Sequence, residues 1–338
     1  MHMADALLTP QVGGAFWGIT AGTIVYCSRK IKKDPDESRI PLMGILGAFI
    51  FAAQMINFSI PATGSSGHLG GGMILAILLG PAPAFLTIAS VLVVQALFFA
   101  DGGLLALGCN IFNLGFFPAF IAYPLVFKPI AGTDPGHRRI FWACLLSSLV
   151  ALQLGSLFVV LQTGWSGISA LPFTSFLLAM QPIHLAIGLV EGLVTAVVVK
   201  LVWQSQPELI LLRRTKVEMP SGGWRKIGIP LLTVTLLISG LISWYASENP
   251  DGLEWSIAKS SDHQELLTPA QPVHGLLKEL QSKTALLPDY GFAEPAAAQE
   301  NVWLTRTGTS LSGLIGSVLT LLVALLLGFF VKKRSGNS

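Results

Sequence analysis

The chain has 338 residues, of which 52% are hydrophobic and only 12% charged, and its mean hydropathy is +0.66. Soluble proteins carry about 25% charged residues, so the composition argues against a water-soluble globular protein and predicts a membrane protein. The net charge of +3 is small, and no basic cluster accompanies a nucleic-acid-binding motif, so we expect no nucleic-acid partner.

Apolar stretches long enough to cross a bilayer recur along the whole chain. A spanning helix needs about 20 mostly apolar residues, and such stretches lie at 11–28, 41–58, 82–99, 104–127, 139–162, 175–203, 227–245 and 308–331. Between the second and the third, residues 59–81 begin rich in Gly, Ser and Thr and become apolar at 72–80. We expect a loop that folds into the bundle and then a short helix, because irregular backbone at membrane depth must be covered by protein.

This order of segments predicts an all-α polytopic membrane protein. We expect residues 1–203 to form a seven-helix bundle, residues 204–226 a charged cytoplasmic linker, and residues 227–338 a two-helix hairpin that encloses an external loop at 246–307. The first residues, MHMADALLTP, place no basic region before an apolar stretch, so we expect no cleaved signal peptide.

The basic residues predict the orientation in the membrane. All but four of the 21 Lys and Arg residues fall in loops or helix ends on one side of the predicted spans. Cytoplasmic loops are rich in Lys and Arg, so that side is the cytoplasmic one. We therefore expect a multi-pass protein of the cell membrane, surrounded by lipid, with an extracytoplasmic N-terminus and a cytoplasmic C-terminus. The external segment 246–307 has nine acidic residues against four basic ones, and it is either a solvated domain or an aid to metal entry or loop closure.

Two histidines stand out as metal ligands. The α-amine of Met1, the backbone nitrogen of His2 and Nδ1 of His2 can close a five-membered and a six-membered chelate ring around one ion. His68, in the external glycine-rich loop, is the natural fourth nitrogen, and the glycines around it would let the backbone fold tightly. A square of four nitrogens is typical of Ni(II) or Cu(II) sites.

Other candidate residues lie inside the predicted spans. His184 and Glu191 share one helix face with Gln181, and ionisable groups within a membrane are functional candidates. A structural role as hydrogen-bonded polar support is the alternative. Small residues recur every fourth position in two spans, where they allow close helix packing either within the chain or against another membrane subunit: Gly14, Gly18 and Gly22, then Gly44, Ala48 and Ala52.

Several of these stretches resemble a known family. MHMADALLTP at the start, residues 65–113 and HLAIGLVEGLVT at 184–195 are similar to the CbiM/NikM family, the metal-binding S components of energy-coupling factor (ECF) transporters. The resemblance spans nearly all of 1–203. The sequence PDGLE at 250–254, after a membrane span, resembles the CbiN/NikN-type partner fused to the same chain.

The resemblance implies a site, a cargo and partners. The metal would be Ni²⁺ or Co²⁺, bound as substrate by the Met1 amine, the His2 backbone and ring nitrogens, and His68. Asp5 matches an acidic residue near the family's start, although the family's Asp-Gly-Phe reads Asp5-Ala6-Leu7 here. The partners would be a membrane-embedded coupling (T) subunit, for which Gly44, Ala48 and Ala52 form our candidate contact, and cytoplasmic ATPase subunits.

Other functions remain open at this point. The chain contains no GxxxxGK[ST] sequence, so we expect no P-loop ATPase activity of its own. The fusion to a PDGLE-type segment favours nickel over cobalt as the cargo. An intramembrane enzyme using His184 and Glu191 is a second possibility, although no HExxH sequence or serine nucleophile motif accompanies them. A purely structural membrane subunit is the third.

Overall fold

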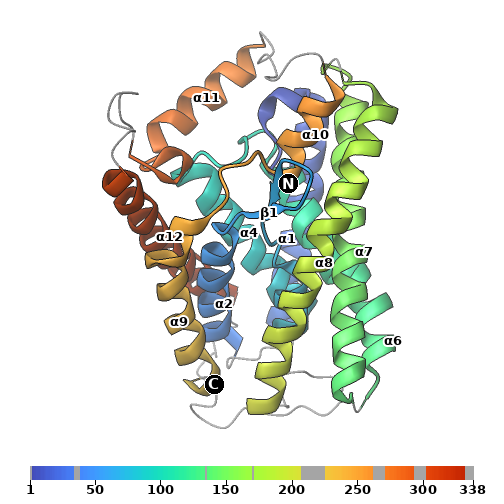
Figure 1. The fold of residues 1–338 in the computed structure, drawn as a ribbon, viewed down its shortest axis with the longest axis vertical. Helices are drawn as coiled ribbons and strands as arrows, with labels where there is room; N and C mark the ends of the chain where they lie inside the picture. Colours follow the sequence, from blue (N-terminus) through green and yellow to red (C-terminus); the bar gives the residue numbers. More distant parts are fainter. Residues whose placement is uncertain are drawn as a thin grey trace.

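The computed structural model describes residues 2–33, 39–133, 135–169, 171–206, 225–261, 271–292 and 302–331. Long helices run side by side as one bundle, and shorter helices lie across one end of it (Figure 1). The first part of the bundle consists of α1 (Pro10–Lys33), α2 (Arg39–Gln54), α3 (Gly72–Leu79), α4 (Pro81–Phe98), the continuous run α5 (Leu107–Ile111), η2 (Phe112–Phe127) and α6 (Lys128–Ala131), then α7 (His137–Ser166) and α8 (Phe173–Ser205).

The second part adds two long helices and several short ones. Its elements are α9 (Arg225–Gly240), η4 (Ile242–Tyr245), α10 (Gly252–Ser260), α11 (Pro272–Thr284), η5 (Pro288–Tyr290) and α12 (Val302–Val331). Each predicted span overlaps a helix or a helical run, although 41–58 extends past the end of α2 into β1, and the short helix expected at 72–80 is α3 (Gly72–Leu79). Most of the predicted linker 204–226 lies outside the described residues.

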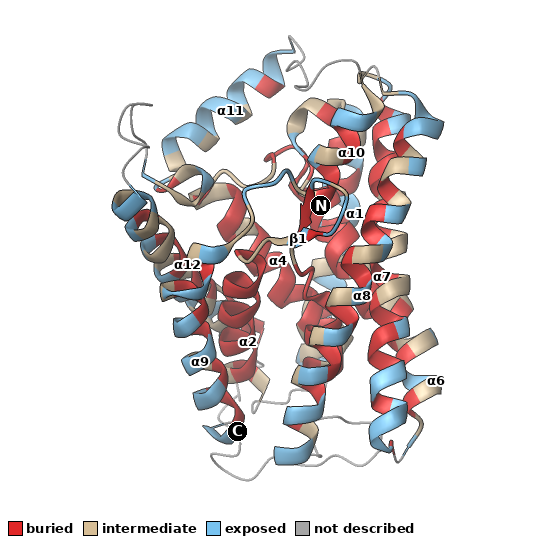
Figure 2. Ribbon diagram, in the orientation of Figure 1, coloured by how far each residue is buried: buried red, intermediate tan, exposed pale blue. Residues whose placement is uncertain are grey.

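The outer surface of the bundle is apolar. Five helical segments among the described residues are long and apolar enough to cross a membrane: α4, the run from α5 to α6, α7, α8 and α12. On α8 the exposed residues recur every fourth position from Leu185 to Leu201, whereas His184 and Glu191 are buried on the opposite face. Figure 2 shows the same division, with buried residues turned inward and exposed faces outward. The protein is therefore an all-α membrane protein whose polar side chains face the bundle interior.

Two local features differ from the uniform α-helices that hydropathy predicts. The run from 112 to 127 is a π-helix, and it contains Pro118 and Pro124. Proline has no N–H and its ring clashes with the carbonyl of residue i−4, so the helix widens around these positions. In addition, the loop before α3 contains a hairpin of β1 (Phe58–Ile60) and β2 (Ser65–Gly67), in which Ser59 pairs with Ser66.

The stripe of Gly44, Ala48 and Ala52 is buried within the chain, which corrects our expectation that it contacts a coupling subunit. A Cβ added to Gly44 would lie 2.7 Å from the side chain of Leu325 on α12. The Ser317 hydroxyl of α12 donates to the Ala48 carbonyl at 3.4 Å, and Ala52 is fully buried. The small residues let the chain's own last helix approach closely. The other stripe, Gly14, Gly18 and Gly22 on α1, has no described atom within 4 Å of an added Cβ.

The segment between α9 and α12 packs onto the end of the bundle that carries the chain's first residues (Figure 1). Within it, α10 lies against α8, and α11 spans the N-terminal turn and the loop after α4. In α11 the buried residue is His274, whose Nε2 donates to the carbonyl of Leu8 at 2.9 Å and of Asp5 at 3.2 Å. The segment between α9 and α12 therefore holds the N-terminal segment in place.

Candidate metal site

The structure brings His2 and His68 together from opposite sides of the bundle end. Their imidazole rings stack with centroids 5.0 Å apart and planes 12° apart. Both side chains are nearly buried, with 7% and 9% of their surface exposed. Met1, the third residue of the predicted site, lies outside the described residues.

The N-terminal segment is fixed by hydrogen bonds of the residues that follow His2. The Met3 N–H donates to Asn110 Oδ1 at 2.8 Å, and the Met3 carbonyl accepts from the Gly103 N–H at 2.9 Å. Asp5 accepts the N–H of Ala106 at 3.0 Å. The sequence left the role of Asp5 open, and the structure assigns it the anchoring of this segment to the loop before α5.

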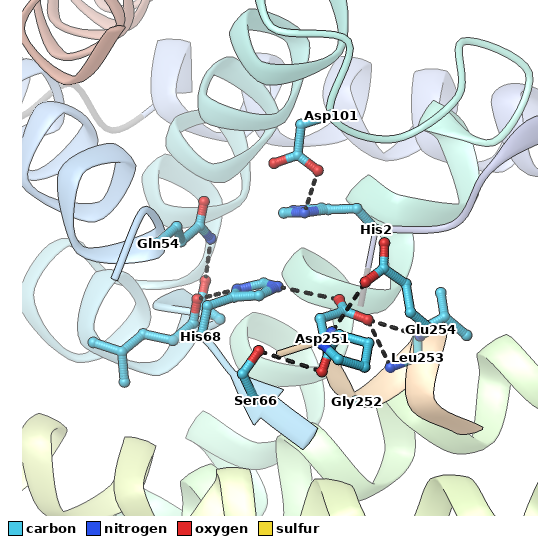
Figure 3. A network of polar contacts seen from close by, with 12 residues as sticks. His2, Gln54, Ser66, His68, Asp101, Asp251, Gly252, Leu253 and Glu254 are labelled. Atoms are coloured by element: carbon cyan, nitrogen blue, oxygen red, sulfur yellow. Dashed lines mark hydrogen bonds and ion pairs between the residues drawn. The ribbon is translucent and has the colours of Figure 1, made fainter. Parts of the chain in front are cut away.

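His2 forms a polar chain with two residues that the sequence did not single out. Its Nδ1 lies 2.9 Å from Asp101 Oδ1 (Figure 3). The Tyr290 hydroxyl donates to Asp101 Oδ2 at 2.5 Å. Burial opposes ionisation of Asp101, but the charge and hydrogen bond of His2, with the Tyr290 hydroxyl, outweigh it and lower the pKa of Asp101 to about 2. A nitrogen that faces a carboxylate carries a proton, so a chelate through Nδ1 requires this imidazole to turn away from Asp101.

The loop that carries His68 is held by Glu191 of α8. The two carboxylate oxygens of Glu191 accept the N–H groups of Gly70 at 2.8 Å and Gly71 at 3.1 Å. Gln54 at the end of α2 donates to the Gly70 carbonyl at 2.8 Å. Gly71 has φ = +75°, a conformation that favours glycine, and so the loop can turn directly into α3. Glu191 is thus an anchor of the loop that carries His68.

His68 is neutral in this setting. Its Nδ1 faces the Leu69 carbonyl at 3.1 Å and therefore carries the proton, which leaves Nε2 with a lone pair. Burial lowers the pKa of His68 to about 3, from an ordinary value of 6.5. The imidazole thus stays in the form that binds metal ions. Its Nε2 lies 3.8 Å from Asp251 Oδ2.

Asp251 belongs to the PDGLE stretch, which docks directly on the His68 loop. The Ser66 N–H donates to the Pro250 carbonyl at 2.8 Å, and the Ser66 hydroxyl donates to the Asn249 carbonyl at 2.8 Å. Asp251 caps α10, because its Oδ1 accepts the N–H groups of Leu253 and Glu254, both at 2.8 Å. The cap fixes the carboxylate beside His68.

A polar cavity of about 400 Å³ opens beside the two histidines. Among the described residues, five acidic side chains and one basic one, Arg306, line it together with His2 and His68; the acids are Asp101, Glu248, Asp251, Glu254 and Asp289. A cleft with this sign of charge attracts cations. Nevertheless, among the described residues no three His, Cys, Asp or Glu side chains form a ready metal cluster, so a tight site here needs backbone or terminal nitrogens as well.

His184 does not pair with Glu191, although the two share a helix face. Nδ1 of His184 donates to the Met180 carbonyl at 2.8 Å, and Gln181 bonds Ser156 at 3.0 Å. The sequence reasoning missed Asp101, Tyr290 and Gln54, and it named Asp251 only as part of PDGLE. For Asp101 the available signal was an acidic residue directly after an apolar span; Tyr290 and Gln54 gave no comparable signal.

Comparisons with known proteins identify relatives of both parts of the chain. Residues 2–209 match the CbiM family model, described as the cobalt uptake substrate-specific transmembrane region, and residues 225–333 match the PDGLE domain. The chain is 29% identical to the fused nickel transport protein NikMN of Rhodobacter capsulatus over 94% of both chains. It is 34% identical to the cobalt transport protein CbiM of Acetoanaerobium sticklandii, over 62% of this chain and 86% of that one.

A solved structure has the same fold. The crystal structure of a truncated transition metal transporter matches 60% of this chain and 99% of its own, with a TM-score of 0.54 and 27% identity. The sequence resemblance is thereby confirmed. The family model covers more than half of the 338 residues. The protein therefore belongs to the CbiM family of substrate-specific transmembrane regions, and a PDGLE domain follows that region in the same chain.

Proposed function

We propose that the chain is the metal-capturing membrane component of an importer for divalent transition-metal ions, with nickel as its cargo. The observation that carries the proposal is the stacked pair of His2 and His68, which are nearly buried and line an acidic cavity. Neutral imidazoles suit Ni²⁺ and Co²⁺, and an acidic approach favours a cation over any other cargo.

The donor set proposed for the cargo is the Met1 amine, the His2 backbone nitrogen, Nδ1 of His2 and His68. The scarcity of side-chain ligands supports it, because the described residues hold no cluster of three side-chain donors. To bind, Nδ1 of His2 leaves Asp101, which is then free to accept the proton that the ligand loses. Tyr290 holds the other oxygen of Asp101 and keeps that carboxylate facing His2.

The relatives support nickel over cobalt. A relative that matches 94% of this chain, PDGLE part included, is named a fused nickel transport protein. Relatives named cobalt transport proteins match only 62% of it. The contact of Ser66 with the PDGLE stretch ties that extra part to the His68 loop.

Partners supply the energy in this proposal. The chain has no GxxxxGK[ST] sequence, so ATP hydrolysis falls to separate cytoplasmic subunits that act through a coupling subunit in the membrane. The metal site would face the outside and the basic loops the cytoplasm. An intramembrane enzyme fits less well, because His184 and Glu191 each bond backbone groups and not one another.

The test is the metal content and visible absorption spectrum of the purified chain loaded with Ni²⁺. A square-planar nickel–nitrogen complex is yellow and diamagnetic, and we expect one equivalent of it. His2→Ala and His68→Ala should each lose it, whereas His137→Ala, at an exposed site on α7, should keep it. Tight nickel binding by either His2→Ala or His68→Ala would refute the proposed site.

A further inference from the structure

An apolar groove of about 460 Å³ lies between α8 and α9, away from the metal site. One wall is formed by Val190, Val194 and Val198, which recur every fourth position and so share one face of α8. The other wall includes Leu231 and Val234 of α9, which packs mainly on α2 and α12. Direct helix packing therefore leaves a space at this junction between the CbiM region and the PDGLE domain.

The groove opens sideways onto the apolar outer surface of the bundle. Val197, Leu201 and Val234 line it and are 58%, 59% and 41% exposed. Apart from Ser205 and Lys226, the described residues that line it are apolar. A water molecule is held in a cavity only where it finds two to four polar partners. The groove therefore suits an apolar occupant that enters from the bilayer.

The size of the groove fits an acyl chain and excludes a helix. Its α8 wall runs from Val190 to Ser205, which is about 22 Å at a helical rise of 1.5 Å per residue. This length covers most of the hydrocarbon core of a bilayer, which is about 30 Å thick. A helix of the same length and about 10 Å diameter has a volume of about 1,700 Å³, several times that of the groove. A helix of a second copy or of a partner subunit therefore does not fit inside it, whereas a single flexible chain does.

One end of the groove carries a positive charge. Lys226, which is exposed in the first turn of α9, lines the groove together with Ser205 at the end of α8. The other end of α9 leads to Ser247, whose N–H donates to the Asn57 carbonyl at 2.7 Å beside the acidic cavity. Lys226 thus belongs to the end of the bundle opposite the N-terminus (Figure 1), where the basic loops predict the cytoplasm. Anionic lipids are concentrated in the cytoplasmic leaflet and are attracted by Lys and Arg near its surface.

We propose that the groove binds one anionic phospholipid, whose acyl chain fills the space between α8 and α9 and whose phosphate group faces Lys226. The bound lipid completes the junction between the CbiM region and the PDGLE domain, because its chain supplies the apolar contacts that the two helices do not make with each other. The groove also reaches Leu69, the residue after His68. The lipid therefore supports, from behind, the loop that carries His68.

The experiment measures lipid binding to the full-length, delipidated protein by native mass spectrometry. Dioleoyl phosphatidylglycerol is compared with dioleoyl phosphatidylcholine, which has the same acyl chains but no net charge. We expect one phosphatidylglycerol per chain to be retained, and to raise the melting temperature more than phosphatidylcholine does. Lys226→Gln should lower the affinity for phosphatidylglycerol about fivefold. Lys200→Gln, exposed on α8 but outside the groove, should leave that affinity unchanged.

A second pair of variants tests the acyl-chain part of the site. Val194→Trp fills the groove and should abolish retention of the lipid, whereas Leu193→Trp, on the exposed outer face of α8, should keep it. Lys226→Gln changes no packed residue, so the test stands even where Val194→Trp does not fold. Two results would overturn the proposal. Either both lipids bind equally and Lys226→Gln changes neither, or the folded wild type retains no phospholipid because detergent or the chain's own residues fill the groove.

Discussion

Glu191→Gln offers a sharp test of how the His68 loop is held. Both oxygens of the Glu191 side chain accept backbone N–H groups, from Gly70 at 2.8 Å and from Gly71 at 3.1 Å. Glutamine has the same shape but only one oxygen, so its NH₂ group must face one of the two N–H donors. The substitution therefore removes one hydrogen bond and leaves one buried N–H unpaired.

The size of the effect follows from these two losses. A hydrogen bond to a charged group contributes about 1.5–3 kcal/mol, and an unpaired buried N–H costs about 1–3 kcal/mol. Allowing for partial relaxation, the closed loop should lose about 2–4 kcal/mol. If metal binding requires the closed loop, the Kd for Ni²⁺ rises roughly 30- to 700-fold, at 1.4 kcal/mol for each factor of ten.

The assay is competition between the purified protein and a chelator of known nickel affinity. Thr195→Val is the matched control, since Thr195 is buried on the same helix one turn away and contacts Ser148, not the loop. We expect Thr195→Val to keep wild-type affinity. A Glu191→Gln protein that is folded, by its thermal melt, and still binds nickel like the wild type would refute the role of Glu191 in closing the loop.

Three further predictions concern the segments around the histidines. Gly103→Ala should abolish nickel binding measured by calorimetry, because the added Cβ would overlap the carboxyl of Asp5, whereas Gly18→Ala, with no described atom within 4 Å, should not. Ser66→Ala loses the bond to the Asn249 carbonyl, worth about 1 kcal/mol, and should weaken binding about fivefold; an unchanged Kd would contradict the docking role. Because the pKa of His68 is about 3 in the folded chain, its contribution to stability is complete above pH 6.5 and falls below it by up to about 1.4 kcal/mol per pH unit. Unfolding measured from pH 7 to pH 4 should show a shallower pH slope for His68→Asn, and equal slopes would be the contrary result.

Much of the helical architecture could be predicted from the sequence, because membrane-spanning helices are specified by hydropathy over about 20 residues. The predicted stretch 175–203 is α8, and 308–331 lies within α12. The short α3 was also predictable, since 72–80 is apolar but bounded by glycines. What periodicity could not specify was the partner of each helix face. The small residues Gly44, Ala48 and Ala52 could pack against any helix that approaches closely, and only the tertiary structure shows that this helix is α12.

The candidate site was predictable only in part. His2 and His68 could be chosen because their chemistry is local: a histidine next to an amine, and a histidine among glycines. Asp101 and Tyr290 lie 189 positions apart in the chain, and the contacts of these residues and of Asp251 depend on how the segment between α9 and α12 folds back on the bundle. The anchoring role of Glu191 was equally hidden, because a side chain in α8 gives no sign in the sequence that it bonds Gly70, 121 positions earlier.

The central claim, that the first two residues chelate the metal, is tested most directly by a matched pair of tagged proteins. One carries a tag joined to Met1 and the other the same tag after Ser338, with both termini verified by intact mass. A tag on Met1 converts its amine into an amide and blocks the chelate without changing any side chain. We predict that the C-terminally tagged protein binds one equivalent of Ni²⁺ tightly and the N-terminally tagged protein does not. Equal, tight nickel binding by both proteins would contradict the account.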